Sequence, residues 1–366
     1  MFLIPIVYAS DNNGINQITV SIYSLLKNKK PETNYEIYVF SKEFAEASQV
    51  DLETIVNSFP GSTIKFIDCK KYEERFDLSG IEMRDKGLRN IKWPSPTYYR
   101  LLVPLILKDK ERAIYLDIDT LVLSDLSELF KQEFNGYAAG VINHPVAGWI
   151  QWMNECIRNN TMEDRWIYKH FNSGTKEYDN YIQAGMFLFN IPMWKNIDFD
   201  KLFVLAHEKN FNDEDLINYS FKGQLHVLPN KYNYCVHFVN DVNYKNFPEY
   251  FGKPIEKFDE ELNQAQIIHF SARGIKPDYI INQTTIYLMS ETGNFDKFIN
   301  LLDDFEMFSM IYDMKKSPQY AQRMKFLADT YQKIIQQSSK SGAYKKLLRK
   351  WFKYAYEILN KYGIKA

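Results

Sequence analysis

The chain has 366 residues, of which 45% are hydrophobic, and this is enough for one large domain with an appendage or for two domains. Its formal net charge of −1 excludes a protein whose bulk surface binds nucleic acid, so we expect no nucleic-acid partner. Its three cysteines form no Cys-x-x-Cys motif, which predicts free, mostly buried thiols in a reducing, cytoplasmic environment. No apolar run is long enough to cross a membrane, and the short apolar start predicts a strand and not a signal peptide.

Strand and helix patterns alternate along the first part of the chain. Residues 4–9 are apolar and predict a buried strand, which ends in the polar turn 10–14. Residues 35–40 and 64–67 predict two further strands with helical patterns between them, whereas the charged stretch 70–91 predicts a surface loop. This order is typical of an α/β fold, a mostly parallel twisted sheet flanked by helices, in which ligands bind beyond the carboxyl ends of the strands.

The polar turn after the first strand is a candidate nucleoside site. Its Asp11 and Asn13 have side chains that bind nucleobases or ribose in other proteins, but both residue types are also ordinary turn formers. The turn lacks Gly-x-Gly-x-x-Gly, which weighs against a dinucleotide fold, and the chain has no P-loop motif. Both interpretations of Asp11 and Asn13 therefore stay open at this point.

The apolar run 114–122 contains two carboxylates, Asp117 and Asp119, one residue apart. On a strand, alternation places both on one side and Ile118 on the other. Neighbouring carboxylates repel each other and resist burial unless a cation lies between them, and oxygen ligands favour Mg²⁺ or Mn²⁺. The pair therefore indicates a metal–diphosphate site at the end of a buried strand. Two aspartates that end a strand and cap the next turn would give the same pattern.

The segments before and after this pair contain basic and aromatic residues that are further candidates. Residues 93–101 lead into a predicted helix through Leu102 and Ile106, which Pro104 weakens. Before this helix Arg100 stands beside two tyrosines, where a guanidinium can bind a phosphate or a carboxylate or form a surface salt bridge. Residues 144–181 are polar, rich in aromatics and without clear periodicity. They predict an acceptor-binding lid or, equally well, a helical insertion that packs its aromatics inward.

A predicted buried strand and a predicted helix supply further polar candidates. In the strand at 183–190, Gly185 would let a ligand approach the backbone closely. The helix that starts near Asn212 opens with three consecutive carboxylates, from Asp213 to Asp215. Acidic residues in a first turn complement the helix dipole, but three together are more than a cap needs.

A histidine near residue 270 is the last candidate. His269 ends a short apolar strand and precedes a glycine-containing loop with two cations, one of which is Lys276. A lone histidine is more often structural than a ligand. A histidine that ends a strand before a basic loop, however, suits a metal–diphosphate site.

The order of these motifs resembles glycosyltransferase family 8. The matching segments are Asp-x-Asn at 11–13, Tyr-Tyr-Arg at 98–100, Tyr-Leu-Asp-Ile-Asp at 115–119, Gln-Ala-Gly at 183–185, Asp-x-Asp-x-x-Asn at 213–218, His-Phe at 269–270 and Lys-Pro at 276–277. The resemblance spans residues 3 to about 278. It implies a Rossmann-like GT-A catalytic domain over residues 1–282, followed by a helical C-terminal extension over residues 283–366.

The resemblance also implies roles for individual residues. Asp117, Asp119 and His269 match the family's ligands for Mn²⁺ or Mg²⁺, and Asp213 matches the aspartate that binds the sugar hydroxyls. The positions that match contacts to the UDP-sugar donor are Ala9, Asp11, Asn13, Arg100, Ile118, Gln183, Ala184, Gly185 and Lys276.

Several positions depart from the family pattern. Glu214 stands where the family commonly has glutamine, close to the reacting carbon, and Gln183 replaces an asparagine. Asp278 replaces a common tryptophan. The loop from His269 to Lys276 is one residue longer than usual, which affects the alignment of Lys276.

The implied activity is a hexosyltransferase that moves galactose or glucose from a UDP-sugar to a glycan acceptor, lipid- or protein-linked, in the synthesis of surface polysaccharide, lipooligosaccharide or glycoprotein. Retention of configuration requires either a carboxylate nucleophile, for which Glu214 and Asp215 are candidates, or a front-face route in which the leaving phosphate accepts the acceptor's proton. The alternative is a weakly active sugar-nucleotide- or glycan-binding protein on the same fold. A metal phosphohydrolase would normally show more histidine and aspartate ligands.

Residues 340–366 are rich in lysine and arginine, and their apolar residues recur at helical spacing. This pattern predicts a basic amphipathic helix that lies on an anionic membrane, peripheral on the inner face of the plasma membrane. In the other interpretation the apolar stripe docks on the catalytic domain. If the chain without residues 340–366 sediments with anionic liposomes as the whole chain does, the membrane prediction is wrong.

Overall fold

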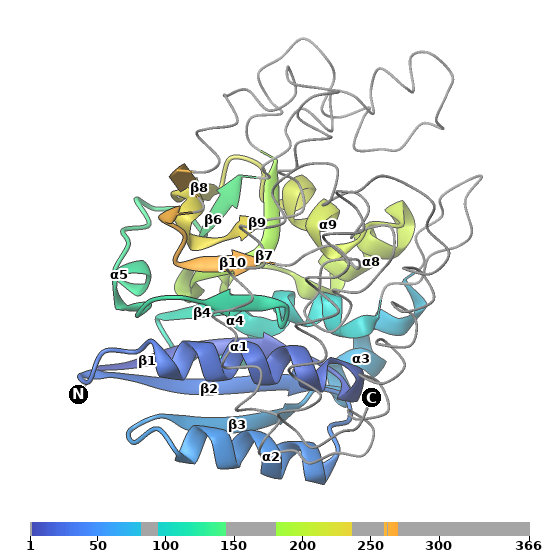
Figure 1. Cartoon of the computed structure of the whole chain (residues 1–366). Helices are drawn as coiled ribbons and strands as arrows, with labels where there is room; N and C mark the ends of the chain where they lie inside the picture. The colour runs from blue at the N-terminus through green and yellow to red at the C-terminus, as the bar shows by residue number, and fades with distance from the viewer. Residues whose placement is uncertain (1, 82–93, 144–180, 236–259, 262, 270–366) are drawn as a thin grey trace, which may run out of the picture. The chain divides into compact units, whose positions relative to one another are not determined.

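The computed structural model describes residues 2–81, 94–143, 181–235, 260–261 and 263–269 (Figure 1). All of them belong to one compact unit of the chain. The predicted lid, apart from Tyr181, lies outside the described residues, and so do Lys276 and the predicted helical extension. The domain boundary at residue 282 stays a prediction.

Strands and helices alternate in the described part of the chain, as predicted. The strands are β1 (Phe2–Ala9), β2 (Thr33–Ser41), β3 (Thr63–Asp68), β4 (Arg112–Leu116), β5 (Thr120–Val122), β6 (Ala139–Asn143), β7 (Ile182–Asn190), β8 (Leu225–Val227), β9 (Tyr234–Cys235) and β10 (Ile267–His269). The α-helices are α1 (Ile15–Lys27), α2 (Glu46–Asn57), α3 (Lys70–Phe76), α4 (Val103–Ile106), α5 (Ser127–Phe130), α8 (Phe199–Lys209) and α9 (Asp213–Ser220). The 3-10 helices are η1 (Asn12–Gly14), η2 (Leu78–Gly80), η3 (Ser95–Leu102), η5 (Ile191–Trp194) and η6 (Asn230–Tyr232).

The strands form two sheets. The larger has seven strands in the order β3-β2-β1-β4-β7-β6-β8, and the smaller has three in the order β5-β10-β9. In the larger sheet β7 runs antiparallel to both of its neighbours, and every other pairing is parallel. This confirms the predicted mostly parallel α/β fold. The chain winds outward from β1 to β2 and β3 on one side and to β4 on the other, so the carboxyl ends of β1 and β4 form a topological switch point, where ligands bind in such sheets.

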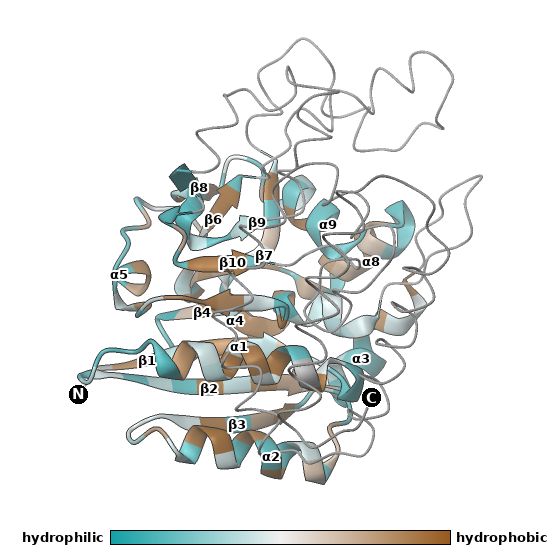
Figure 2. Ribbon diagram, viewed as in Figure 1, coloured by the Kyte–Doolittle hydropathy of each residue, from teal (hydrophilic) through white to brown (hydrophobic). Residues whose placement is uncertain are grey.

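Two hydrophobic clusters cover the two faces of the larger sheet. Along β1, Ile4 and Ile6 belong to the cluster that α1 and α2 cover, whereas Val7 belongs to the cluster that α3, α8 and α9 cover. Figure 2 shows the corresponding apolar colouring on much of α1, β4 and β10. Burial of one such aliphatic side chain contributes about 1.5–3 kcal/mol. A one-residue slip of register would exchange the two faces of a strand, so burial on both faces holds the strands in place.

The prediction of a surface loop over residues 70–91 is wrong for its first part, because α3 and η2 occupy it. The prediction failed because α3 is mostly charged and buries only Glu73 and Phe76, too few residues to show helical spacing in the sequence. Phe76 packs against Phe203 of α8, with ring centroids 4.6 Å apart. Glu73 is buried and accepts a hydrogen bond from the Tyr99 hydroxyl. Contacts with distant segments therefore stabilise this helix.

The helix predicted through Leu102 and Ile106 is present as the short helix α4, and the 3-10 helix η3 precedes it. Pro104 lies in the first turn of α4, where its missing N–H is not needed. None of the helices in the described part of the chain has the length and apolar character needed to cross a membrane.

Candidate active site

The two aspartates of the central motif lie between two strands and not within one. β4 ends at Leu116, Asp117 to Asp119 form the connection, and β5 begins at Thr120 in the smaller sheet. The prediction that strand alternation aligns the two carboxylates is therefore wrong. They reach the same place because the connection turns: the Asp117 N–H donates to the Gly185 carbonyl (2.8 Å), and the Asp117 carbonyl accepts from the Thr120 hydroxyl (2.8 Å).

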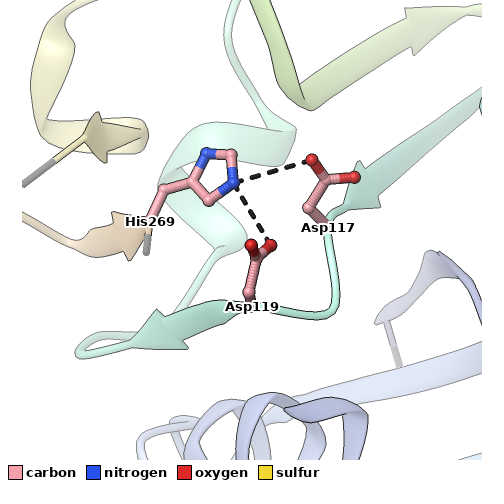
Figure 3. Close-up of side chains that lie close together, drawn as sticks. All are labelled: Asp117, Asp119 and His269. Carbon is pink, nitrogen blue, oxygen red and sulfur yellow. Dashed lines mark ion pairs between the residues drawn. The ribbon is translucent and has the colours of Figure 1, made fainter. Parts of the chain in front are cut away.

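His269 lies beside the two aspartates, although it follows them in the sequence by about 150 residues. β10 lies between β5 and β9, and its register places His269 opposite Thr120. The imidazole Nε2 lies 3.2 Å from Asp119 Oδ1 and 3.6 Å from Asp117 Oδ2 (Figure 3). The three ligand atoms lie within 4.8 Å of one another. Two carboxylate oxygens and one imidazole nitrogen fit a divalent cation such as Mn²⁺.

The protonation of His269 agrees with a cation site. Burial lowers the pKa of His269, but the negative charge of Asp119, Cys235 and the hydrogen bonds to both residues together raise the pKa well above its ordinary value. In the metal-free protein this shift favours the protonated imidazole, whose positive charge offsets part of the negative charge of the two carboxylates. Metal binding releases protons from ligands of this kind.

Gly185 makes room for the imidazole. A Cβ at this position would lie 2.1 Å from His269 Cε1 and 2.4 Å from His269 Nδ1. Sequence analysis expected Gly185 to let a ligand approach the backbone, but the ring of His269 takes this space. The small residue thus serves the predicted metal site through its histidine.

Arg100 connects the aspartate pair to α9. Its buried guanidinium lies 2.8 Å from Asp117 Oδ1 through Nη2 and 2.9 Å from Asp213 Oδ2 through Nε. Nη1 donates to the Ala184 carbonyl, and the guanidinium carbon lies 4.9 Å from the centroid of the Tyr115 ring. Arg100 therefore pairs with two carboxylates of the site inside the protein, and the prediction of a surface salt bridge does not apply.

The three carboxylates at the start of α9 have different surroundings. Asn212 caps the helix, since its Oδ1 accepts from the Asp215 N–H (2.6 Å). Asp213 faces Arg100, and burial raises the pKa of Asp213 to about 6 although the guanidinium opposes the shift. Asp215 accepts from the Tyr181 hydroxyl at 2.9 Å and is buried. The carboxylates therefore do more than complement the helix dipole, because two of them pack inward against polar partners.

Glu214 points toward β7. Its Oε2 accepts a hydrogen bond from the Ala184 N–H at 3.0 Å. Burial raises the pKa of Glu214 to about 8; the Ala184 N–H opposes this shift, and the charges of Asp213 and Asp215 add to it. In the ligand-free protein Glu214 is therefore protonated at neutral pH. It is then an uncharged hydrogen-bonding group, as the family's glutamine would be.

We expect Glu214→Gln to stabilise the ligand-free protein, and to do so more at pH 8 than at pH 5. The carboxyl's pKa is about 8 in the folded protein against an ordinary value of 4.5, so only the unfolded chain loses this proton between these values. Stability then falls as the pH rises from about 5 to 8, and the neutral amide avoids this loss. Thermal unfolding should show a melting temperature at least about 3 °C higher at pH 8. The control is Glu208→Gln, which changes an exposed glutamate on α8. If Glu214→Gln raised the melting temperature equally at pH 5 and pH 8, the raised pKa of Glu214 would be refuted.

The turn after β1 lies beside the aspartate pair. Asp11 caps η1, and its carboxylate accepts from the backbone N–H groups of Asn13 (2.9 Å) and Gly14 (3.2 Å). This supports the turn-forming interpretation of Asp11. Ile118 reaches the same turn, because a Cβ on Gly14 would lie 2.5 Å from Ile118 Cδ1. Ala9 ends β1 and is buried, and Asn13 is exposed, so the predicted nucleoside residues and the aspartate pair share one edge of the sheet.

Gln183 is bound to the protein itself. Its Oε1 accepts from the Gly185 N–H at 2.7 Å and from the Asn233 side-chain amide. Asn218 of α9 holds the neighbouring strand residue, accepting from the Ile182 N–H (2.8 Å) and donating to its carbonyl (3.0 Å). These contacts hold the start of β7 in place beside the site.

Sequence analysis missed four polar residues around the site: Tyr115, Asn218, Asn233 and Cys235. Tyr115 donates to Asp117 Oδ1 at 2.8 Å, and it lies inside the motif that was recognised. Asn218 likewise ends a recognised motif. Nothing in the sequence pattern pointed to Asn233 or Cys235, because their place depends on the pairing of β9 with β10.

The fold and the grouped carboxylates define a class of protein. The chain has the GT-A fold of glycosyltransferases such as LgtC. The crystal structure of the galactosyltransferase LgtC in complex with donor and acceptor sugar analogs matches with a TM-score of 0.55 at 18% identity, covering 82% of this chain and 96% of LgtC.

The sequence identifies the family within this class. The model of "Glycosyl transferase family 8" matches residues 5–277, and the protein belongs to this family. A lipopolysaccharide 1,3-galactosyltransferase of Salmonella typhimurium is 25% identical over 241 residues, covering 62% of each chain. A lipopolysaccharide 1,2-glucosyltransferase of Escherichia coli is 22% identical over 243 residues, covering 62% of this chain and 61% of the relative. The aligned part therefore spans less than two thirds of either relative.

Proposed function

We propose that this family 8 glycosyltransferase is a metal-dependent, retaining enzyme that moves galactose or glucose from a UDP-sugar to a glycan acceptor. The observation that carries the proposal is the group of Asp117, Asp119 and His269 at the carboxyl end of β4, beside the turn that follows β1. The similarity to lipopolysaccharide galactosyl- and glucosyltransferases supports a hexose donor.

The proposed chemistry requires positive charge near the donor, because the leaving group is a nucleoside diphosphate. A divalent cation held by Asp117, Asp119 and His269 would neutralise charge that develops on the diphosphate. Arg100 orients Asp117, since its guanidinium donates to that carboxylate. The turn from Asp11 to Asn13 is the proposed contact for uridine.

The carboxylates of α9 are the proposed groups around the donor sugar. Asp213 is proposed to bind sugar hydroxyls while Arg100 holds its carboxylate in place. Glu214 is proposed to face the anomeric carbon, where its ionised form stabilises the developing oxocarbenium-like charge or acts as a nucleophile. Asp215, bound by the Tyr181 hydroxyl, is the second candidate for the nucleophile.

We expect Glu214→Gln to lower the turnover number at pH 8 by at least about tenfold, since one tenfold step corresponds to 1.36 kcal/mol of transition-state stabilisation. The native enzyme should gain activity as the pH rises toward about 8, where Glu214 loses its proton, whereas the glutamine variant should lack this rise. Initial rates across pH 6 to 9 measure both effects. Turnover near the wild-type value would reject a nucleophilic role and an essential electrostatic one.

A screen of sugar nucleotides tests the proposed function. UDP-galactose, UDP-glucose and other sugar nucleotides are incubated with the protein and Mn²⁺, and released UDP is measured with and without a chelator. We expect hydrolysis of a UDP-hexose that the chelator abolishes, and an α-configured product from an α-configured donor in proton NMR spectra. Donor binding without hydrolysis or transfer would favour the sugar-nucleotide-binding alternative.

The proposed function includes a glycan acceptor and an association with membranes. A glycan on a lipid or a protein is the proposed acceptor, with residues 144–181 as its lid. The basic tail at 340–366 would bring the enzyme to an anionic membrane surface. Both segments lie outside the described residues, so these proposals rest on sequence pattern.

A further inference from the structure

Cys235 lies directly beside the histidine of the proposed metal site. In the small sheet β9 runs parallel to β10, and their register pairs Cys235 with His269. Both side chains are buried, with exposed fractions of 2% and 1%. The thiol sulfur lies 3.7 Å from His269 Nδ1, within hydrogen-bond range for sulfur. The imidazole thus has the aspartates at Nε2 and a thiol at Nδ1.

The thiol has a second partner that orients it. The Cys235 S–H donates to the Asn233 carbonyl at 3.8 Å, so the sulfur lone pairs are left to accept from His269 Nδ1–H. A histidine that binds a metal through one nitrogen must carry its proton on the other, and a hydrogen bond to the second nitrogen selects this tautomer. Gly185 lies against the same ring, and the lack of space there restricts its rotation.

We propose that Cys235 is a positioning residue: it accepts a hydrogen bond from His269 Nδ1–H and thereby presents the Nε2 lone pair to the cation between Asp117 and Asp119. This inference rests on the proposed metal-dependent function. The partner of a metal-binding histidine is usually a carboxylate, a carbonyl or water, and here a buried thiol takes that place. A serine hydroxyl can make both hydrogen bonds of the thiol, whereas valine fills the space without an acceptor.

Binding of Mn²⁺ alone, followed by the electron paramagnetic resonance signal of the free ion, tests the proposal. We expect Cys235→Val to weaken Mn²⁺ binding about tenfold, as for other partners of metal-binding histidines, and Cys235→Ser to stay within about threefold of the wild type. Cys69→Val is the matched control, because Cys69 is a buried thiol that also donates to the carbonyl two residues before it, at 3.7 Å. It should bind Mn²⁺ as the wild type does. Melting temperatures of all variants report on folding.

The outcomes separate this inference from the proposed function. Wild-type protein that binds no Mn²⁺ would overturn the proposed metal site and the role of Cys235 with it. Wild-type affinity in Cys235→Val would overturn the positioning role alone. If Cys235→Val and Cys235→Ser lost Mn²⁺ affinity equally, packing and not the hydrogen bond would matter. If Cys69→Val lost as much Mn²⁺ affinity as Cys235→Val, the loss would be a general effect of thiol removal. Either result contradicts the proposal.

Discussion

Asp119→Asn should reduce Mn²⁺-dependent hydrolysis of the UDP-sugar donor by about a thousandfold, which corresponds to about 4 kcal/mol of transition-state stabilisation. The carboxylate is buried, its Oδ1 lies 3.2 Å from His269 Nε2, and it contributes one of the three ligands of the proposed site. An amide of the same shape keeps the packing but removes the negative charge that attracts the cation. Measurement of UDP release at saturating Mn²⁺ and donor gives the size of the effect.

Asp125→Asn is the matched control for this experiment. Asp125 is also buried, and its carboxylate accepts from the backbone N–H groups of Lys30 (2.9 Å) and Ser127 (3.0 Å), away from the site. The exchange should leave hydrolysis within about twofold of the wild type, because Asp125 takes no part in the site; the single amide oxygen keeps only one of the two backbone bonds, so any loss should appear in the melting temperature. Substantial Mn²⁺-dependent activity in Asp119→Asn would contradict the assignment of Asp119 as a ligand.

Gly185→Ala should weaken Mn²⁺ binding by about a hundredfold and reduce turnover to a similar extent. The new methyl group would lie 2.1 Å from His269 Cε1, far closer than two non-bonded carbon atoms can approach, so the imidazole or the β7 backbone must shift. Either shift moves Nε2 away from the aspartates. Isothermal titration with Mn²⁺ and initial rates measure the two losses.

Gly140→Ala separates this local effect from general strain in the sheet. Gly140 lies on β6 beside β7, and a Cβ there would lie 2.7 Å from the terminal Leu228 Cδ1, far from the imidazole. This variant should lower the melting temperature and keep the Mn²⁺ affinity of the wild type. If Gly185→Ala binds Mn²⁺ as tightly as Gly140→Ala does, the close packing of Gly185 on His269 has no functional importance.

The hydrophobic pattern of the sequence determined the fold class. The continuous apolar run of β1, which is buried on both faces, and the helical spacing of apolar residues in α1 follow from local geometry. They can therefore be read without knowledge of distant segments. The position of Asp11 after β1 and of Asp117 after β4 placed both at the ligand-binding edge, because parallel strands end on the same side. The resemblance to the family, which the match over residues 5–277 confirms, predicted Asp117, Asp119 and His269 as metal ligands.

Only the tertiary structure decided how these residues meet. The aspartates align through a turn between two sheets and not through strand alternation, because the chain leaves the larger sheet at Leu116. Arg100 is a buried partner of Asp117 and Asp213, and Cys235 is the neighbour of His269. Such contacts join segments that are far apart in the chain, and their energies depend on burial and strand pairing, which no local pattern of residue types encodes.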